Sequence, residues 1–226
     1  FTSANADSKL EAADLDAVIV PGGFGERGIE GKLASVKWAR EHGIPFLGIC
    51  LGFQMAVVEF ARNVVELQDA NSAEFDVNCA HPVIAELPDQ KEIEGLGGTM
   101  RLGGQDVAIA QESFAEQLFA STSVRERFRH RYEVEPKYIE QLTKAGLIFS
   151  GHHPEHQIMQ ILELSPEVHP YFVAGQFHPE LTSRPLRPQP MFMGLVAAGI
   201  VHRTGEKHPQ GVDARWLSGN NSAANV

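Results

Sequence analysis

The sequence predicts an α/β protein, with helices on both faces of a mostly parallel, doubly wound sheet in a three-layer αβα arrangement. Short apolar, β-branched runs alternate with segments of helical apolar spacing, and the connections between them are short. The first two apolar runs both end in glycine-rich turns that lead into helices. Because ligands bind at the carboxyl ends of strands in such sheets, we expect the functional site there.

The apolar pattern places the elements in order along the chain. Strands are expected at residues 16–20 and 44–49, followed by helices at 30–42 and 51–62. Proline, glycine and acidic residues dominate residues 79–104, which predicts loops with short edge strands. Further strands are expected at 127–134, 147–150, 157–164 and 171–177, and further helices at 136–145 and 191–201.

The length of 226 residues suits a single domain. We expect this domain to span residues 1–205, because residues 206–226 are rich in proline, glycine, asparagine and serine and predict a disordered tail. The chain opens on a polar stretch rather than on a strand, which indicates a domain that is incomplete at its N-terminus.

Composition excludes several classes of function. The 19 Lys and Arg against 29 Asp and Glu give a net charge of -10, which repels a phosphate backbone, so no nucleic-acid partner is expected. The most apolar stretch, residues 191–201, falls short of the ~18 residues that a membrane helix needs. Two isolated cysteines, Cys50 and Cys79, form no disulfide or zinc framework and favour a reducing, cytoplasmic location.

Cys50 is the candidate nucleophile. It is the central residue of a Gly-x-Cys-x-Gly segment, residues 48–52, at a strand-to-helix junction where a sharp turn projects the side chain out of the sheet. Its place at a helix N-terminus favours the thiolate, and the next amide, that of Leu51, can stabilise an oxyanion. The alternative is a small buried hydrophobic residue, which is the interpretation that we give to Cys79.

A cysteine nucleophile needs a base and a group that orients this base. His178 and Glu180 follow the apolar strand 171–177, and the proline between them lets both side chains face the same way. His153 and Glu155 repeat the same His-Pro-Glu pattern, so spacing alone leaves both pairs open. The histidines around residue 153 lack the helical or strand spacing of a zinc site.

Residues 23–28 match Gly-x-Gly-x-x-Gly after a strand, which is also the pattern of a dinucleotide-binding turn. That reading needs an acidic residue at the end of the next strand, where Cys50 stands instead. The glycine amides are better suited to supply a second oxyanion donor.

Four arginines alternate in residues 124–132 and share one face of a strand, with aromatic residues on the other face. In a chain of net charge -10 we favour a local anion site or a salt-bridged edge strand over nucleic-acid binding. The residues are Arg125, Arg127, Arg129 and Arg131, opposite Phe128, His130 and Tyr132.

Taken together, these motifs resemble those of the class-I (triad) glutamine amidotransferases, and within them the amidotransferase domains of CTP synthases. The resemblance covers residues 16–203 and favours His178 over His153 as the base. It rests on six segments that stand in the family's order: residues 21–28, 48–54, 70–75, 98–103, 129–134 and 176–180.

The resemblance implies hydrolysis of L-glutamine to glutamate and ammonia through a triad of Cys50, His178 and Glu180. The amides of Gly23 and Leu51 would hold the oxyanion. Glu74 would bind the α-ammonium group of glutamine and Arg131 its α-carboxylate, with a tolerated Phe53 in place of the family's common methionine. The full set of implied glutamine-binding residues is Gly23, Leu51, Gly52, Phe53, Gln54, Glu74 and Arg131.

The resemblance also implies partners outside this chain. Ammonia would pass to a synthetase domain, absent here, that converts UTP to CTP with ATP and magnesium, while GTP activates the coupling. We expect no cofactor or metal in the amidotransferase domain itself. We also expect that the first strand of the sheet is missing from this chain. The full-length protein is expected to be a homo-oligomer, a tetramer. Effector or lid residues would be Phe24, Arg27, Glu30 and Arg101.

Two other functions remain open at the level of the sequence. The chain could be a catalytically silent interaction or regulatory module of a larger synthetase, as its incomplete start suggests. It could also be a γ-glutamyl hydrolase or peptidase of similar fold, although Glu74 and Arg131 suit a free amino acid better.

Overall fold

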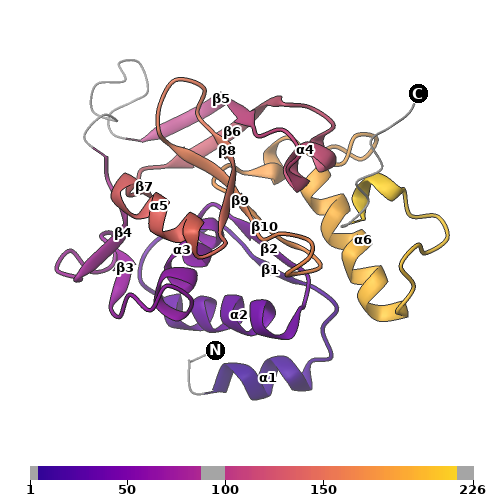
Figure 1. Ribbon diagram of the computed structural model, residues 1–226, viewed down its shortest axis with the longest axis horizontal. Coiled ribbons are helices and arrows are strands. Elements are labelled where there is room, and N and C mark those ends of the chain that lie inside the picture. The colour runs from indigo at the N-terminus through magenta and orange to yellow at the C-terminus, as the bar shows by residue number, and fades with distance from the viewer. Residues whose placement is uncertain (1–4, 88–99, 218–226) are drawn as a thin grey trace.

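A computed structural model describes residues 5–87 and 100–217 of the chain. Its centre is a seven-stranded sheet with the strand order β1-β2-β10-β9-β8-β5-β6 (Figure 1). The strands are β1 Val18–Val20, β2 Phe46–Ile49, β5 Arg101–Ile109, β6 Ser123–His130, β8 Ile148–His152, β9 Met159–Glu163 and β10 Phe172–Gly175.

The first three strands of this order, β1, β2 and β10, are parallel neighbours. The pairings from β10 through β9, β8 and β5 to β6 are antiparallel. Five of the seven strands, all but β9 and β5, therefore point in the same direction. The predicted α/β fold with a mostly parallel sheet is confirmed, and the antiparallel pairings are a feature that the apolar pattern did not reveal.

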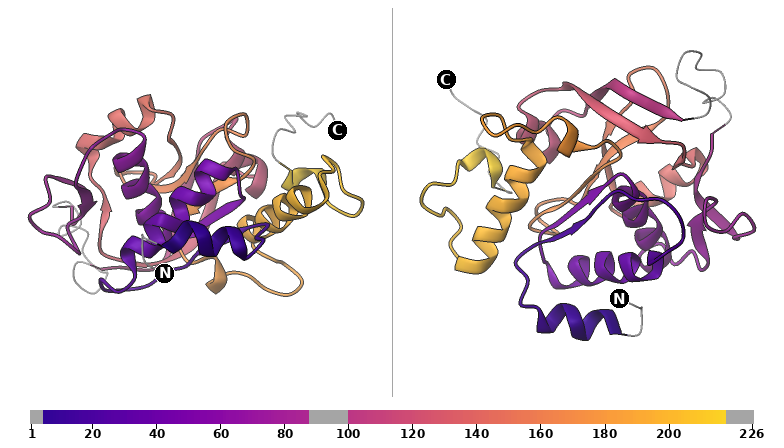
Figure 2. Two further views of the ribbon diagram at one scale, coloured as in Figure 1. Left: turned by 90° about the horizontal axis from the view of Figure 1, so that it is seen from below. Right: turned by 180° about the vertical axis from the view of Figure 1, so that it is seen from behind.

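Helices cover both faces of the sheet, as expected (Figures 1 and 2). Neighbouring strand residues alternate between two core clusters, so that Phe46 packs on one face and Leu47 on the other. The helices α2 Ile29–His42, α3 Leu51–Asn63 and α5 Pro136–Lys144 cover the first face; α4 Phe114–Phe119 and α6 Pro190–Thr204 cover the second.

A second, three-stranded sheet lies beside α3 and comprises β3 Ala70–Ser72, β4 His81–Ala85 and β7 Glu133–Val134. β3 and β4 are parallel, and β7 is antiparallel to β4. Since β7 follows β6 after two residues and Glu74 follows β3, this small sheet brings the segment around Glu74 close to the end of β6.

Part of the expected disordered tail is in fact packed. Residues 206–217 include the 3-10 helix η4, Ala214–Trp216, and both Trp216 and Leu217 are buried in the core on the α6 face. Gln117 in α4 donates hydrogen bonds to the carbonyls of Arg215 and Leu217. The prediction of disorder is wrong for residues 206–217, because burial of Trp216 and Leu217 in the core holds this segment in place despite its proline and glycine content. Residues 218–226 lie outside the described part of the chain.

At the other end of the chain, helix α1, Ala6–Ala12, packs along α2 (Figure 1). β1 is an edge strand that, among the described residues, pairs only with β2. The expected absence of a first strand stays a prediction. No helix in residues 5–87 and 100–217 has the length and apolar character needed to cross a membrane.

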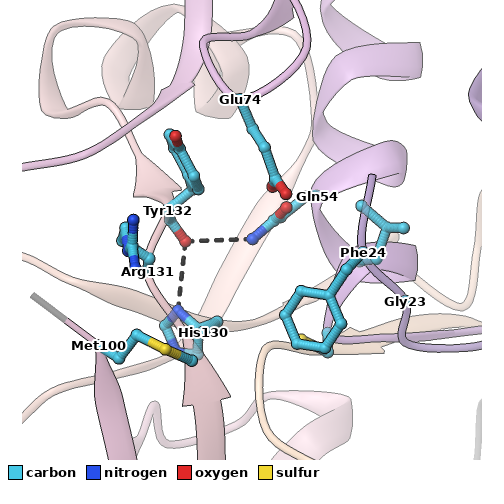
Figure 3. A pocket seen from close by; sticks show the side chains of 10 residues that line it. Gly23, Phe24, Gln54, Glu74, Met100, His130, Arg131 and Tyr132 are labelled. Atoms are coloured by element: carbon cyan, nitrogen blue, oxygen red, sulfur yellow. Dashed lines mark hydrogen bonds between the residues drawn. The ribbon is translucent and has the colours of Figure 1, made fainter. Parts of the chain in front are cut away.

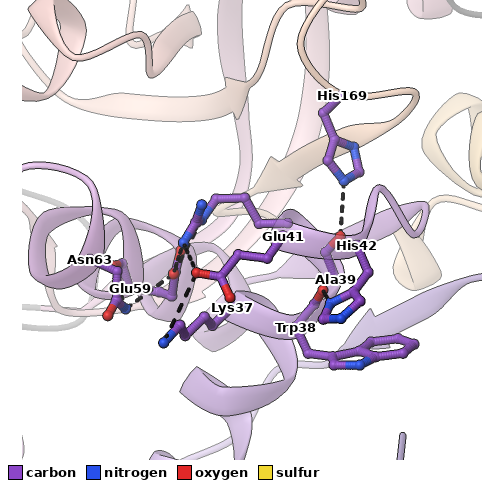
Figure 4. Close-up of polar contacts among 9 residues, drawn as sticks. Lys37, Trp38, Ala39, Glu41, His42, Glu59, Asn63 and His169 are labelled. Atoms are coloured by element: carbon purple, nitrogen blue, oxygen red, sulfur yellow. Dashed lines mark hydrogen bonds and ion pairs between the residues drawn. The ribbon is translucent and has the colours of Figure 1, made fainter. Parts of the chain in front are cut away.

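A buried ion pair joins α2 to α3 (Figure 4). The Arg40 guanidinium donates hydrogen bonds to both carboxylate oxygens of Glu59, at 2.7 and 2.9 Å, and Asn63 Nδ2 donates to the same carboxylate at 3.1 Å. The Glu59 side chain is fully buried, so its charge depends on these donors for solvation.

We expect Arg40→Ala to lower the free energy of unfolding by about 3 kcal/mol, because it leaves a buried carboxylate without its cation. Urea unfolding at pH 7 measures this loss. The control is Lys37→Ala, since the Lys37 ammonium lies 4.0 Å from Glu41 at the surface; it should cost less than about 0.5 kcal/mol. Similar losses in the two variants would contradict a stabilising role for the buried pair.

Candidate active site

Cys50 occupies a strained turn between β2 and α3. Its φ of 51° and ψ of -99° lie in a region that non-glycine residues rarely adopt. The turn packs directly against the end of β1, since a Cβ atom on Gly52 would clash with the carbonyl oxygen of Val20. A Cβ on Gly48 would lie 2.7 Å from the Gly52 carbonyl oxygen. Both glycines of the Gly-x-Cys-x-Gly pattern are thus needed by the turn itself.

The structure brings His178 next to Cys50. A Cβ atom on Gly22 would lie 3.0 Å from His178 Cε1 and 3.5 Å from Cys50 Cβ, so both side chains flank this one glycine. His178 Nδ1 lies 2.6 Å from Glu180 Oε1. With Nδ1–H donating to the carboxylate, Nε2 carries the free lone pair, and this buried atom has no hydrogen-bond partner among the described residues.

The competing pair, His153 and Glu155, lies elsewhere, in the loop between β8 and β9. His153 Nδ1 accepts a hydrogen bond from the backbone N–H of Glu155 at 3.1 Å, and the ring packs against His156. The structure therefore places His178, and not His153, beside Cys50.

Burial raises the pKa of the Cys50 thiol to about 12. The Leu51 backbone N–H and the Gln176 side chain lower the pKa, whereas the charges of Glu133 and Glu180 raise it further. The expectation that the helix N-terminus yields a resting thiolate is wrong, because the loss of solvation outweighs the amide. At neutral pH Cys50 is a thiol, and a base must remove its proton.

A cavity of about 270 Å³ opens over Cys50 (Figure 3). This is just below the roughly 300–1,000 Å³ of pockets for drug-sized molecules, and suits a ligand of amino-acid size. The lining residues are Gly23, Phe24, Cys50, Leu51, Gln54, Glu74, Met100, His130, Arg131 and Tyr132.

Glu74 and Arg131 supply opposite charges to this cavity. Burial raises the pKa of the Glu74 carboxyl, while the Gly25 backbone N–H and the Arg131 charge oppose the rise. Gln54 reaches the cavity from the first turns of α3, and its Nε2 donates a hydrogen bond to the Tyr132 carbonyl at 3.1 Å (Figure 3).

Comparison with known proteins decides the family. The family model described as "Glutamine amidotransferase class-I" matches residues 2–198. The chain belongs to the class-I glutamine amidotransferases. A CTP synthase of Haloarcula hispanica is 57% identical over 86% of this chain and 34% of its own length. One of Archaeoglobus fulgidus is 54% identical over 86% of this chain and 36% of its own length.

The chain thus spans about a third of the length of the curated relatives that it matches. Among solved structures, the glutaminase domain of Trypanosoma brucei CTPS with bound acivicin has a TM-score of 0.80 and 38% identity. That match covers 93% of this chain and 80% of the trypanosomal chain. The amidotransferase fold predicted from the sequence is therefore confirmed.

Two residues predicted to bind glutamine in this amidotransferase lie outside the cavity lining. Phe53 is fully buried in the core on the α2 face. Gly52 contacts the backbone of Val20, as described above. Both follow Cys50 in a helix, and helical rotation turns them away from the cavity while Gln54 faces it.

The predicted effector residues have different surroundings. Phe24 is 66% exposed at the mouth of the cavity, with the Arg129 guanidinium 5.8 Å from its ring centre. Arg27 is exposed, and Glu30 forms a 3.0 Å ion pair with Arg62. Arg101 is only 2% exposed, and this burial excludes it from a surface effector site.

Arg101 instead belongs to a buried polar cluster at the back of the cavity. Its Nη1 lies 3.3 Å from Glu133 Oε1, its Nη2 bonds to Gln105, and its guanidinium lies over the Phe128 ring. Because Glu133 is fully buried, this arginine balances its charge.

Three of the alternating arginines, Arg125, Arg127 and Arg129, share the exposed face of β6, with Phe128 and His130 buried opposite, as predicted. The fourth, Arg131, follows the end of the strand. The four arginines do not form one anion site. Arg125 pairs with Asp106 of β5 at 2.9 Å, whereas Arg129 lies over Phe24 and Arg131 lines the cavity. The salt-bridged edge is thus found at the start of the strand, and an anion site at its cavity end stays a prediction.

Three of the cavity residues, Met100, His130 and Tyr132, had no predicted role in the site. All three belong to the segments 98–103 and 129–134 on which the family resemblance rests. Their place in those segments was the available signal, because side-chain type alone gave no indication of a pocket.

His130 is held neutral inside the protein. Burial and then the Arg101 charge lower the pKa of its imidazole to about 3. The folded state resists protonation at pH values where the unfolded chain, with a pKa near 6.5, accepts a proton.

We therefore expect His130 to make the folded state less stable as the pH falls below about 6.5. The penalty is about 1.4 kcal/mol per pH unit, or about 2 kcal/mol between pH 7 and 5. His130→Gln should lose this contribution. Urea unfolding of the parent and the variant at several pH values measures the free energy of unfolding of each. The difference between the two proteins removes the effects of the other titrating groups. The same pH dependence in both proteins would contradict a neutral, buried His130.

Proposed function

We propose that this chain is the glutaminase part of a CTP synthase and hydrolyses L-glutamine to glutamate and ammonia. One arrangement carries the proposal: a cysteine at a strained turn lines the same cavity as two opposite charges, and a histidine oriented by a carboxylate flanks the same glycine as this cysteine. Glu74 suits the α-ammonium group of a free amino acid, and Arg131 suits its α-carboxylate.

In the first half-reaction His178 Nε2 takes the proton of the Cys50 thiol, and the sulfur forms a bond to the carboxamide carbon of glutamine. The electron pair of the C=O bond moves to the oxygen, which the backbone amides of Gly23 and Leu51 stabilise. The C–N bond then breaks, and His178 returns the proton to the leaving ammonia, which leaves a glutamyl thioester.

The second half-reaction regenerates the enzyme. His178 Nε2 removes a proton from water, whose oxygen attacks the thioester carbon. The C–S bond breaks, glutamate leaves, and the thiolate regains the proton from His178. Glu180 stabilises the imidazolium in both halves, because its carboxylate remains bonded to Nδ1.

The proposal extends to partners that lie outside this chain. Ammonia would be consumed by a synthetase domain that aminates UTP with ATP and magnesium, in a cytoplasmic homo-oligomer, a tetramer. GTP would act as the activator. The exposed Phe24 ring beside Arg129, together with Arg27, fits a purine and its phosphates, whereas the buried Arg101 does not.

Cys50→Ala should abolish glutamate release from glutamine, because no other group can form the thioester. Arg131→Ala should raise KM for glutamine with a smaller effect on kcat, since it removes the partner of the α-carboxylate. Glutamate release by the purified chain, with and without GTP, gives both parameters.

Unchanged turnover in the Cys50 variant would contradict the mechanism, and no turnover in the parent chain would favour a silent module. Full glutamine affinity in Arg131→Ala would favour a hydrolase that acts on γ-glutamyl peptides.

Gly22→Ala tests the placement of the base. The new methyl group would displace the His178 ring from which it lies 3.0 Å, and we expect kcat/KM to fall about 100-fold. Gly199→Ala in α6 is the matched control, because its new methyl group makes only ordinary contacts of 3.5 Å or more and should leave activity unchanged. Equal activity of the two variants would exclude this placement of His178.

A further inference from the structure

Gln176 lies directly beside the nucleophile, although the mechanism above does not use it. It follows β10, whose last residue, Gly175, accepts a hydrogen bond from the Cys50 backbone N–H at 2.8 Å. The Gln176 side chain has no solvent exposure. A fully buried carboxamide at this point requires partners for its polar atoms.

A chain of hydrogen bonds fixes which way this carboxamide faces. The Tyr132 carbonyl can only accept, so Gln54 directs its Nε2 toward it, at 3.1 Å. The same Nε2 lies 3.3 Å from Gln176 Oε1. Gln176 Oε1 is therefore the acceptor on the Gln54 side, and the Nε2 donor of Gln176 faces away from Gln54.

That donor has no hydrogen-bond partner among the described residues. Gly175 pairs with Ile49 in the parallel register of β10 and β2, so the residues that follow, Gln176 and Cys50, are neighbours at the ends of these strands. In agreement with this placement, the Gln176 side chain lowers the pKa of the Cys50 thiol. Besides Leu51, whose N–H also lowers this pKa, the groups acting on the sulfur are the carboxylates of Glu133 and Glu180, which raise it. His178 flanks the same glycine as Cys50. The neutral Gln176 donor therefore opposes the effect of the two carboxylates on the pKa of the Cys50 thiol.

We propose that Gln176 is a catalytic residue whose Nε2 donates a hydrogen bond to Cys50 Sγ when the thiol loses its proton to His178. Gln54 and the Tyr132 carbonyl hold Gln176 in the required orientation. This inference rests on the proposed function, because the thiolate is the nucleophile of that reaction. It adds a side-chain donor to the backbone amide of Leu51 and explains why a polar side chain occupies the end of a buried strand.

The thiolate can be tested without turnover. In a Cys79→Ser background, which leaves Cys50 as the sole thiol, the rate of alkylation by iodoacetamide is measured against pH. Gln176→Met preserves size and removes the donor, and should raise the apparent pKa of Cys50 by about 1 unit, which is a roughly 10-fold slower alkylation at neutral pH. Gln176→Glu should slow it further, because a third carboxylate would face the sulfur.

Gln160→Met is the matched control. Gln160 is also a fully buried glutamine, its side-chain amide has no partner within residues 5–87 and 100–217, and its backbone carbonyl accepts the hydrogen bond of the Gln176 backbone N–H at 2.9 Å. A general effect of replacing a buried amide would therefore appear in both variants, whereas a thiolate effect would appear only at Gln176.

The expected result is a shifted alkylation profile for the Gln176 variants alone, with a lower kcat for glutamine. If Gln176 only positions Gln54, its replacement would raise KM for glutamine and leave the pH profile of alkylation the same as in the parent protein. This result would overturn the proposal. So would equal shifts in Gln176→Met and Gln160→Met. If Gln176→Met does not fold, Gln176→Glu decides by the same criterion. If the proposed function is wrong, the parent chain would not hydrolyse glutamine, while the Gln176 variants would still show the shifted alkylation profile.

Discussion

The contact between Gly52 and the carbonyl of Val20 is the constraint on which the site depends. It brings the turn at Cys50 so close to the end of β1 that no side chain fits between them. The parallel pairing of β1, β2 and β10 ends at this same edge, so Gly22, Cys50 and His178 meet there. The strained φ of Cys50 persists because strands on both sides of β2 hold the turn in place.

The environment that positions Cys50 also suppresses the ionisation of its thiol. Burial and two nearby carboxylates keep Cys50 protonated, so reactivity depends on groups that act when the proton leaves. In the proposed mechanism these groups are His178, the amide of Leu51 and the carboxamide of Gln176. A thiol that stays neutral until a substrate arrives is also protected from indiscriminate alkylation and oxidation, which require the thiolate.

Much of the fold was predictable, because the parallel strands and α2 and α3 have uninterrupted apolar patterns and glycine ends. The strained turn at Cys50 was predictable because its geometry demands glycines on both sides. The pairing of Glu74 with Arg131 was not evident from spacing, since 57 positions separate them and only the family resemblance joined them. Burial decides the pKa of Cys50 and the role of Arg101, and burial is a property of the assembled fold. The capping signal Ser113-x-x-Glu116 of α4 was present but overlooked.

Strand β6 contacts both Cys50 and His178 and leads into the cavity, although it lies at the edge of the sheet. The Arg127 carbonyl accepts the His178 backbone N–H at 2.8 Å, the Arg129 carbonyl lies 3.9 Å from the Cys50 sulfur, and Arg131 follows at the cavity. Because side chains alternate along a strand, one inserted or deleted residue between positions 126 and 131 would exchange the buried and exposed sets. Length variation during evolution should therefore be accommodated in the loop between β8 and β9, and the spacing within β6 should be fixed.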